Sequence, residues 1–302
     1  MKVLTIGAAV VDIVVARALP MRGAKQDVEH IGLYAGGGAV NAGLNFAARG
    51  ARVAVHAAVG RDLEGSLIAD LLARQGLRAA FDALDEPTGK AVVIVDEQGA
   101  ARAYAQRGAS ARVGEGGFPG LGDCELVYVT GLSLKSQECL QAALARLPRR
   151  GFRLAVTPGA RQLSRPDGLA ALRCAADLLC MNAHEAARLC GEDPPEDVDG
   201  RGIAPERAEA LARRVVVREG QGALVTLGAS GAVFYDGQAA HFGAPHRVDV
   251  VSTVGAGDAY ASAFAHEWAR GASPSRALSE AAASAAEVIG TLPANLAGAL
   301  RR

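Results

Sequence analysis

The sequence predicts an α/β protein with a mostly parallel sheet, helices on both of its faces and a small second sheet. First, short apolar runs alternate with segments of helical period along most of the 302 residues. Second, the opening run from Val3 to Ile6 is apolar throughout, as expected of a strand covered on both faces. Third, short strands and loops interrupt this alternation at residues 13–35 and 88–111.

The first strand leads to a candidate ligand-binding acid. The strand ends at Gly7, and Asp12 follows five residues later. Ligands of open α/β sheets bind at the carboxyl edge of the strands, and we therefore expect Asp12 at that edge. The spacing alone is equally compatible with a turn or a capping role for this residue.

A glycine triplet opens the first predicted helix. Gly36, Gly37 and Gly38 lack a Cβ, so backbone at this point can approach a ligand closely. Asn41 falls in the first turn of the helix, where its side chain can cap the helix or bind a ligand hydroxyl. A plain turn is the alternative interpretation of the triplet. The helix ends at Gly50, and a strand over 51–60 and a helix over 61–76 come next.

The two interruptions predict a small sheet that acts as a lid. Residues 91–95 and 100–106 read as a β-hairpin around the turn 96–99. Together with residues 13–35, this hairpin can form a separate sheet beside the main one. Lids of phosphotransferases exclude water and so limit wasteful hydrolysis.

The alternation of strands and helices resumes in the second half of the chain. Strands are expected over 125–131, 152–159 and 176–182, and a helix over 137–151. Asn182 and Glu185 then fit the N-cap and third position of a helix, a variant of the capping box. From these two residues alone, a structural role is the stronger interpretation.

Two further features complete the predicted elements. Two strands within 215–237 flank a tight turn from Gly228 to Gly231, which is either a plain hairpin or a surface for a nucleotide. The final helix is expected over 273–290, with Ser273 as its N-cap and Gly290 as its stop.

The segment from Val248 to Phe264 carries the strongest chemical signal. It predicts a strand, a glycine turn at Gly255, Ala256 and Gly257, and a helix with Asp258 in its first turn. A helix N-terminus presents unpaired N–H groups and the positive end of the helix dipole, which together bind anions. An anion site beside a carboxylate suits phosphoryl transfer to a hydroxyl, because the carboxylate can accept the proton.

Composition narrows the class of protein. Thirty-two basic residues balance thirty-two acidic ones, so no overall charge favours nucleic acid or an anionic membrane as partner. No apolar run approaches the roughly 20 residues that span a bilayer. The five cysteines show no CxxC spacing, which indicates reduced thiols in a cytoplasmic protein and argues against a zinc site.

In this order, the motifs resemble those of the ribokinase-like, or PfkB-type, carbohydrate kinases. The first family signature is similar to the segment from Gly36 to Asn41 followed by Gly50 and Gly60, and the second to Ser252–Asp258. Between them lie matches to an Asn-x-x-Glu motif and to a nucleotide turn. The resemblance implies a three-layer Rossmann-like sheet with a small β lid, forming one kinase domain over residues 1–302.

The resemblance also implies an activity, its cofactors and its site residues. It implies transfer of the γ-phosphate of ATP, with Mg²⁺, to a hydroxyl of a sugar or similar acceptor. Asp258 is the expected general base, and the amides around it form the anion hole: Gly255, Ala256, Gly257. The expected nucleotide-binding residues are Asn182, Thr226, Gly228 and Gly231, and Glu185 organises Mg²⁺ through water. The expected acceptor-binding residues are Asp12, Gly37, Gly38 and Asn41. A homodimer formed through the lid sheet is also expected.

Departures from the family pattern leave the acceptor open. Val10 and Gly38 stand where ribokinase has polar residues that contact the sugar, which disfavours D-ribose and suits a nucleoside. Arg107 and Arg161 resemble arginines that bind a carboxylate in 2-keto-3-deoxygluconate kinases, so a sugar acid is the other alternative. Ser252 replaces an aspartate that helps many members to bind a monovalent cation, and a requirement for K⁺ is left open.

Two functions outside the kinases fit these motifs less well. A dinucleotide-binding oxidoreductase needs a GxGxxG motif after the first strand, and only Gly7 is present there. A sensor built on the kinase fold is expected to lack the base, whereas Asp258 is retained.

Overall fold

The computed structural model describes residues 1–16, 25, 27–96, 99–147, 150–195 and 203–291. Its larger sheet has nine strands, of which only the last two in the chain run antiparallel to their neighbours. In spatial order these are β13 (Ala240–Gly243), β12 (Ala232–Tyr235), β11 (Gly222–Thr226), β10 (Leu178–Asn182), β9 (Arg153–Val156), β8 (Leu126–Val129), β1 (Lys2–Ile6), β4 (Arg52–Gly60) and β5 (Arg78–Leu84). The predicted, mostly parallel sheet is therefore confirmed.

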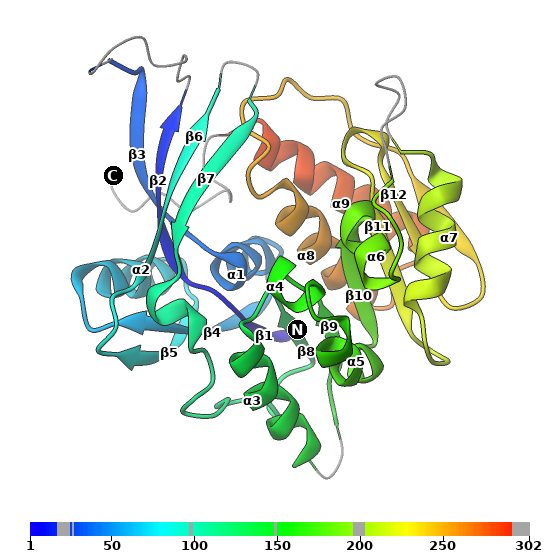
Figure 1. The fold of residues 1–302 in the computed structure, drawn as a ribbon, viewed down its shortest axis with the longest axis horizontal. Coiled ribbons are helices and arrows are strands. Elements are labelled where there is room, and N and C mark those ends of the chain that lie inside the picture. Colours follow the sequence, from blue (N-terminus) through cyan, green and yellow to red (C-terminus); the bar gives the residue numbers. More distant parts are fainter. Residues whose placement is uncertain (17–24, 26, 97–98, 148–149, 196–202, 292–302) are drawn as a thin grey trace.

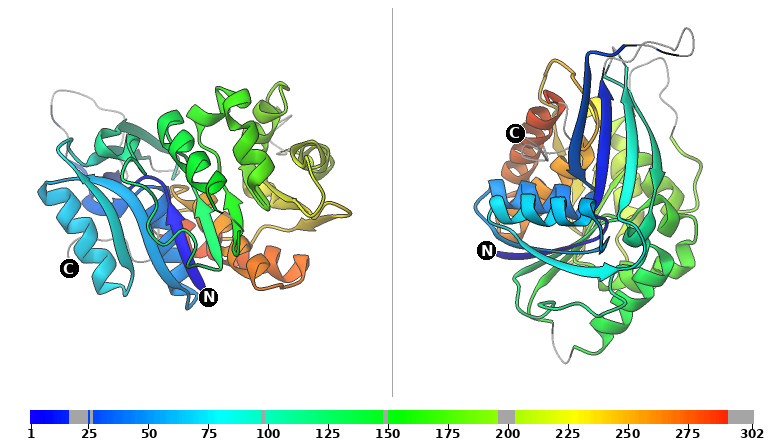
Figure 2. Two further views of the ribbon diagram at one scale, coloured as in Figure 1. Left: turned by 90° about the horizontal axis from the view of Figure 1, so that it is seen from below. Right: turned by 90° about the vertical axis from the view of Figure 1, so that its left-hand side faces the viewer.

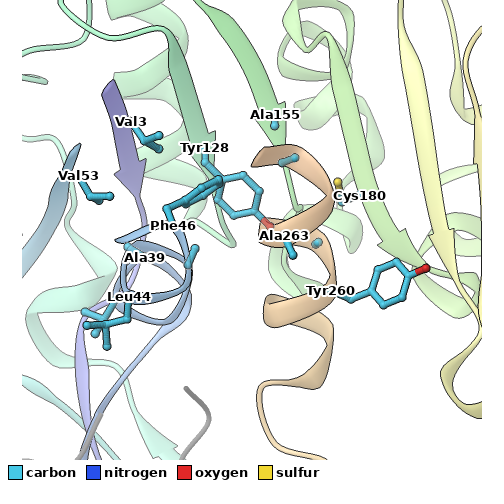
Figure 3. Packing of buried hydrophobic residues seen from close by; sticks show 14 of the residues in the cluster. Val3, Ala39, Leu44, Phe46, Val53, Tyr128, Ala155, Cys180, Tyr260 and Ala263 are labelled. Atoms are coloured by element: carbon cyan, nitrogen blue, oxygen red, sulfur yellow. The ribbon is translucent and has the colours of Figure 1, made fainter. Parts of the chain in front are cut away.

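Helices cover both faces of this sheet (Figures 1 and 2). Alternate residues of the central strands face opposite sides, so Val3 belongs to one apolar core and Leu4 to the other. The first core is closed by α1 (Gly38–Ala48), α2 (Leu63–Arg74), α8 (Ala256–Ala269) and α9 (Pro274–Ile289). The second is closed by α3 (Leu134–Ala145), α4 (Ala160–Leu163), α5 (Pro166–Ala175), α6 (Ala183–Leu189) and α7 (Pro205–Val215). Figure 3 shows the first core, where Phe46 of α1, Tyr128 of β8 and Ala263 of α8 come together.

A second sheet of four strands stands beside the main body (Figure 1). Its order is β3 (His30–Gly36), β2 (Val10–Ala16), β6 (Gly89–Val95) and β7 (Ala101–Gln106). The strands β6 and β7 form the predicted hairpin, and the smaller sheet is confirmed. The predicted lid segment 13–35 includes residues 17–24 and 26, which lie outside the described part of the chain.

Three local expectations were wrong. Asp12 lies within β2 of the small sheet and has neither the turn nor the capping role that its spacing also allowed. Strand β5 was not predicted, because its sequence RAAFDAL mixes polar and apolar residues at the edge of the sheet. The run at 248–252 is not a strand, and Val250 is exposed. Its backbone binds elsewhere: Ser252 N donates to Ile289 O and Thr253 N donates to Gly99 O.

The predicted ends of two helices are confirmed. The side chain of Ser273 caps α9, which runs to Ile289 with Gly290 as the C-cap, as expected. The reciprocal hydrogen bonds of a capping box join Asn182 and Glu185 at the start of α6. Within the described ranges, every helix is too short or too polar for a membrane span.

Candidate active site

The N-terminus of α8 forms the centre of the candidate site. Gly255 is its N-cap and has φ 78°, a left-handed conformation that residues with a Cβ rarely adopt. This turn starts a helix of 14 residues with Asp258 in its first turn. The first amides of such a helix have no intrahelical acceptor and can bind an anion. Amides able to bind an anion and a carboxylate therefore lie within one helical turn.

Asp258 is held by a residue from the first signature. The side-chain amide of Asn41 in α1 donates a hydrogen bond of 3.0 Å to Asp258 Oδ2. Burial raises the pKa of Asp258, and the bond from Asn41 opposes this shift because it favours the ionised form. A carboxyl with a raised pKa is a better proton acceptor than an ordinary aspartate, provided that it is ionised.

Asp12, in β2 of the small sheet, lies near Asp258. Burial raises the pKa of Asp12 to about 7, and the negative charge of Asp258 contributes to the shift. The Asp12 side chain lies directly over Gly36, where a Cβ would be only 1.9 Å from Asp12 Oδ2. The carboxyl groups of Asp12 and Asp258 thus lie between the two sheets, close enough for the charge of one to affect the pKa of the other.

The other two glycines of the triplet are required by different neighbours. Gly37 has φ 91°, and a Cβ on it would lie 2.5 Å from the carbonyl oxygen of Ala8. A Cβ on Gly38 would lie 2.6 Å from Thr130 Oγ1. The triplet therefore lets α1 begin against the ends of β1 and β8, where its first turn meets the site.

A cavity of about 320 Å³ adjoins these groups, but Asp12, Gly36 and Asn41 are not among the residues that line it. Gly37, Gly38, Glu185 and Asp258 line it, together with residues of the small sheet such as Gln106. The cavity thus lies between the main body and the small sheet, as a lid over an active site requires.

Sequence reasoning missed two residues of the cavity wall. Thr130 and Thr157 follow the strands β8 and β9 directly, and both line the cavity. The hydroxyl of Thr157 is 3.0 Å from that of the buried Tyr128. Their signal in the sequence was a polar residue immediately after an apolar strand, since such residues lie at the carboxyl edge of the sheet.

Glu185 forms the capping box of α6 with Asn182 and also lines the cavity. Its Oε2 accepts a bond of 3.0 Å from Asn182 N, and Asn182 Oδ1 accepts one of 2.9 Å from Glu185 N. Burial raises the pKa of Glu185, and the charge of Asp258 adds to the shift. The carboxylates of Glu185 and Asp258 repel each other, and a hard divalent cation such as Mg²⁺, which prefers oxygen ligands, would relieve this repulsion. Asn182 and Glu185 are the residues that would hold it.

The turn that is predicted to contact a nucleotide lies beside this motif. Thr226 ends β11 and is paired in register with Asn182 of β10. Gly231 has φ 95° and is buried, and a Cβ there would lie 2.2 Å from the carbonyl oxygen of Gly243. Gly231 is therefore needed for the turn itself, whereas Gly228 is exposed. The structure places Thr226 beside Asn182, and neither glycine lines the cavity described above.

Two arginines line a recess next to the cavity. Arg107 and Arg161 border this recess of about 40 Å³, which shares Gly131 and Gly159 with the larger cavity. Both arginine side chains are exposed, and neither forms an ion pair with another described residue. The recess therefore offers positive charge to one end of a bound molecule.

Comparisons with known proteins agree with this geometry. A family model described as pfkB family carbohydrate kinase matches residues 1–296. Fructoselysine 6-kinase of Shigella flexneri is 36% identical over 89 residues, which are 28% of this chain and 34% of that protein. The chain thus matches about a third of the length of this curated relative.

Two solved structures share the fold. The adenosine kinase of Sinorhizobium meliloti superposes with a TM-score of 0.76 and 25% identity, covering 99% of this chain and 97% of that one. The ribokinase of Arabidopsis thaliana complexed with ribose and ATP has a TM-score of 0.74 and 22% identity, covering 97% and 93%.

Proposed function

Because the chain belongs to the pfkB family of carbohydrate kinases, we propose that it transfers the γ-phosphate of ATP to a hydroxyl of a small sugar or sugar-like acceptor. The resemblance drawn from its motifs is confirmed at the level of the family. The observation that carries the proposed activity is the start of α8, where Asp258 follows a glycine turn and lines a cavity between two sheets.

In this proposal Asp258 is the general base. It accepts the proton of the acceptor hydroxyl as the phosphoryl group arrives, a role worth roughly 10²–10⁴ in rate. The amides of Gly255, Ala256 and Gly257 stabilise the negative charge that develops on the transferred group. The bond from Asn41 orients the carboxylate before the acceptor binds.

The nucleotide lies on the other side of the transferred group. Asn182, Thr226, Gly228 and Gly231 are its proposed contacts, and Glu185 would hold Mg²⁺ through water. The metal supplies positive charge to the phosphates. The place of Glu185 on the cavity wall supports this assignment, as does the ATP bound in the ribokinase of A. thaliana.

The acceptor occupies the part of the cavity below the small sheet. Asp12, Gly37, Gly38 and Asn41 are its proposed contacts. Asp12 accepts a hydrogen bond from an acceptor hydroxyl, while the glycines leave room for the sugar ring. The small sheet then acts as a lid that excludes water.

Two narrower identities of the acceptor each have a specific observation in their favour. A nucleoside is favoured by the apolar Val10 on the cavity wall and by the likeness to the adenosine kinase of S. meliloti. A sugar acid is favoured by the recess of Arg107 and Arg161, where two guanidinium groups without an ion pair among the described residues can meet a carboxylate.

We also propose a homodimer that forms through the small sheet. Its outer face exposes large apolar side chains: Tyr104 is 74% exposed and Ile31 is 64% exposed. Val92 is paired in register with Tyr104, so these side chains share one face. A second copy of the sheet would remove this apolar surface from water.

A coupled assay of ADP release tests the proposed activity. The screen covers pentoses, hexoses, keto acids and nucleosides, with Mg²⁺ and with or without K⁺. We expect ADP release with members of one acceptor class. If no acceptor releases ADP above the rate without acceptor, the kinase proposal is wrong and a non-catalytic sensor is the better interpretation.

A further inference from the structure

Two hydrogen bonds join α1 to α8, and only one of them reaches the cavity. Asn41 Nδ2 donates to Asp258 Oδ2 at 3.0 Å, and one turn later Asn45 Nδ2 donates to Ser262 Oγ at 3.3 Å. Both contacts advance by four residues on each helix, so the helices run in the same direction with both N-termini at the site. Figure 1 shows α1 and α8 side by side at the centre of the molecule.

The inner pair is buried in an apolar interface. Asn45 is 2% exposed and Ser262 is 0% exposed, among fully buried neighbours such as Phe46 and Ala265. A buried amide or hydroxyl without a partner costs about 1–3 kcal/mol. Turning or sliding α8 against α1 would separate Asn45 from Ser262 and deprive the buried Asn45 amide of this acceptor, whereas Ser262 would keep its bond within α8. The pair therefore selects one register of the two helices.

Ser262 also connects Asn45 to the backbone of Asp258. Its hydroxyl accepts the bond from Asn45 and donates one of 2.6 Å to the carbonyl oxygen of Asp258. Such a back-bond to the fourth preceding residue commonly bends a helix slightly. The chain of bonds from Asn45 through Ser262 to Asp258 thus fixes the first turn of α8 as well as its register.

We propose that Asn45 and Ser262 are positioning residues for phosphoryl transfer. Neither lines the cavity, and both act through Asp258, whose carboxylate they keep against Asn41 and in line with the acceptor hydroxyl. This inference rests on the proposed role of Asp258 as the base. It differs from an ordinary packing role because loss of the pair should impair kcat more than the binding of either substrate.

The test compares Asn45→Ala, Ser262→Ala and the double variant with an acceptor found in the ADP-release screen. We expect each single variant to lower kcat by roughly 10- to 100-fold, with KM for ATP within about twofold of wild type. The double variant should be little worse than the more impaired single variant, because both lose the same chain of bonds. Ser262→Thr keeps the hydroxyl and should restore most of kcat.

A matched control removes another buried serine hydroxyl from the same layer. Ser284 of α9 is 2% exposed and its Oγ has no hydrogen-bond partner among the described residues, so Ser284→Ala should keep wild-type kinetics. The proposal is overturned if the Asn45 and Ser262 variants lose melting temperature but keep kcat. Asp258→Asn is measured in parallel. If it loses kcat while those variants keep it, only the positioning role fails; if it keeps kcat, the proposed base fails too.

Discussion

Replacing Asp12 by asparagine should stabilise the protein at neutral pH while impairing its function. The structure holds the Asp12 carboxyl between two sheets beside Asp258, and raises its pKa from 3.8 to about 7. A raised pKa in the folded state means that folding is penalised once the group ionises. Its contribution is favourable below pH 3.8 and is lost as the pH rises through about 7. Asparagine has the same shape and no charge to desolvate.

The pKa shift sets the size of the effect. Each unit corresponds to about 1.4 kcal/mol, so a shift of about three units gives an upper limit of about 4 kcal/mol at pH 8. At pH 5 only about one unit separates the pH from the unfolded pKa, which leaves about 2 kcal/mol of the penalty. The gain from Asp12→Asn should therefore grow by about 2 kcal/mol between pH 5 and pH 8, or less where solvent in the cavity screens the charge.

Urea unfolding of wild type and Asp12→Asn at both pH values measures this difference. Taking the difference between the two proteins at each pH cancels the titration of groups that they share. Asp70→Asn, on the exposed face of α2, controls for the loss of one negative charge. An equal gain at pH 5 and pH 8 would show that Asp12 is already ionised in the folded state at pH 5, and the reasoning about its burial would be refuted.

Four further predictions address the site and its surroundings. Asp258→Asn should keep nucleotide binding and lower kcat by roughly 10²-fold or more, and turnover near the wild-type rate would refute its role as base. Glu185→Gln should raise the Mg²⁺ concentration for half-maximal ADP release by roughly 10-fold, and an unchanged Mg²⁺ curve would contradict the metal assignment. Arg161→Met should raise KM for an acidic acceptor several-fold but leave that of a neutral one, whereas equal effects would argue against the charge recess. Tyr104→Lys should shift a dimer toward monomer in light scattering, and an unchanged mass would place the interface elsewhere.

The parts of the site that sequence predicted are those fixed by short-range geometry. The capping box at Asn182 and Glu185 depends on contacts within one turn, and the N-cap and stop of α9 are equally local. Likewise, the glycine turn before Asp258 is a property of consecutive residues. The positions of these motifs relative to one another depend on the order of the strands in the sheet. The family resemblance predicted that order, whereas composition did not.

Long-range partners explain what the sequence could not show. Asp12 acquires its raised pKa from burial and from a carboxylate near the other end of the chain. The run at 248–252 has the alternation of a strand, yet the amides of Val251 and Ser252 bind Ile289 and not a neighbouring strand. Alternation reports which side chains favour burial, but it does not say which backbone the chain will meet.

The pair of Asp12 and Asp258 has a consequence for synthesis. Asp12 belongs to the second strand, whereas Asp258 belongs to a helix that follows every described strand in the chain. A nascent chain can therefore complete both sheets before it possesses the proposed base. Until α8 docks, Asp12 lacks its charged neighbour and Asn45 lacks Ser262. Phosphoryl transfer would thus begin only at the final stage of folding. A chain truncated before α8 would lack the proposed base and could not phosphorylate an acceptor.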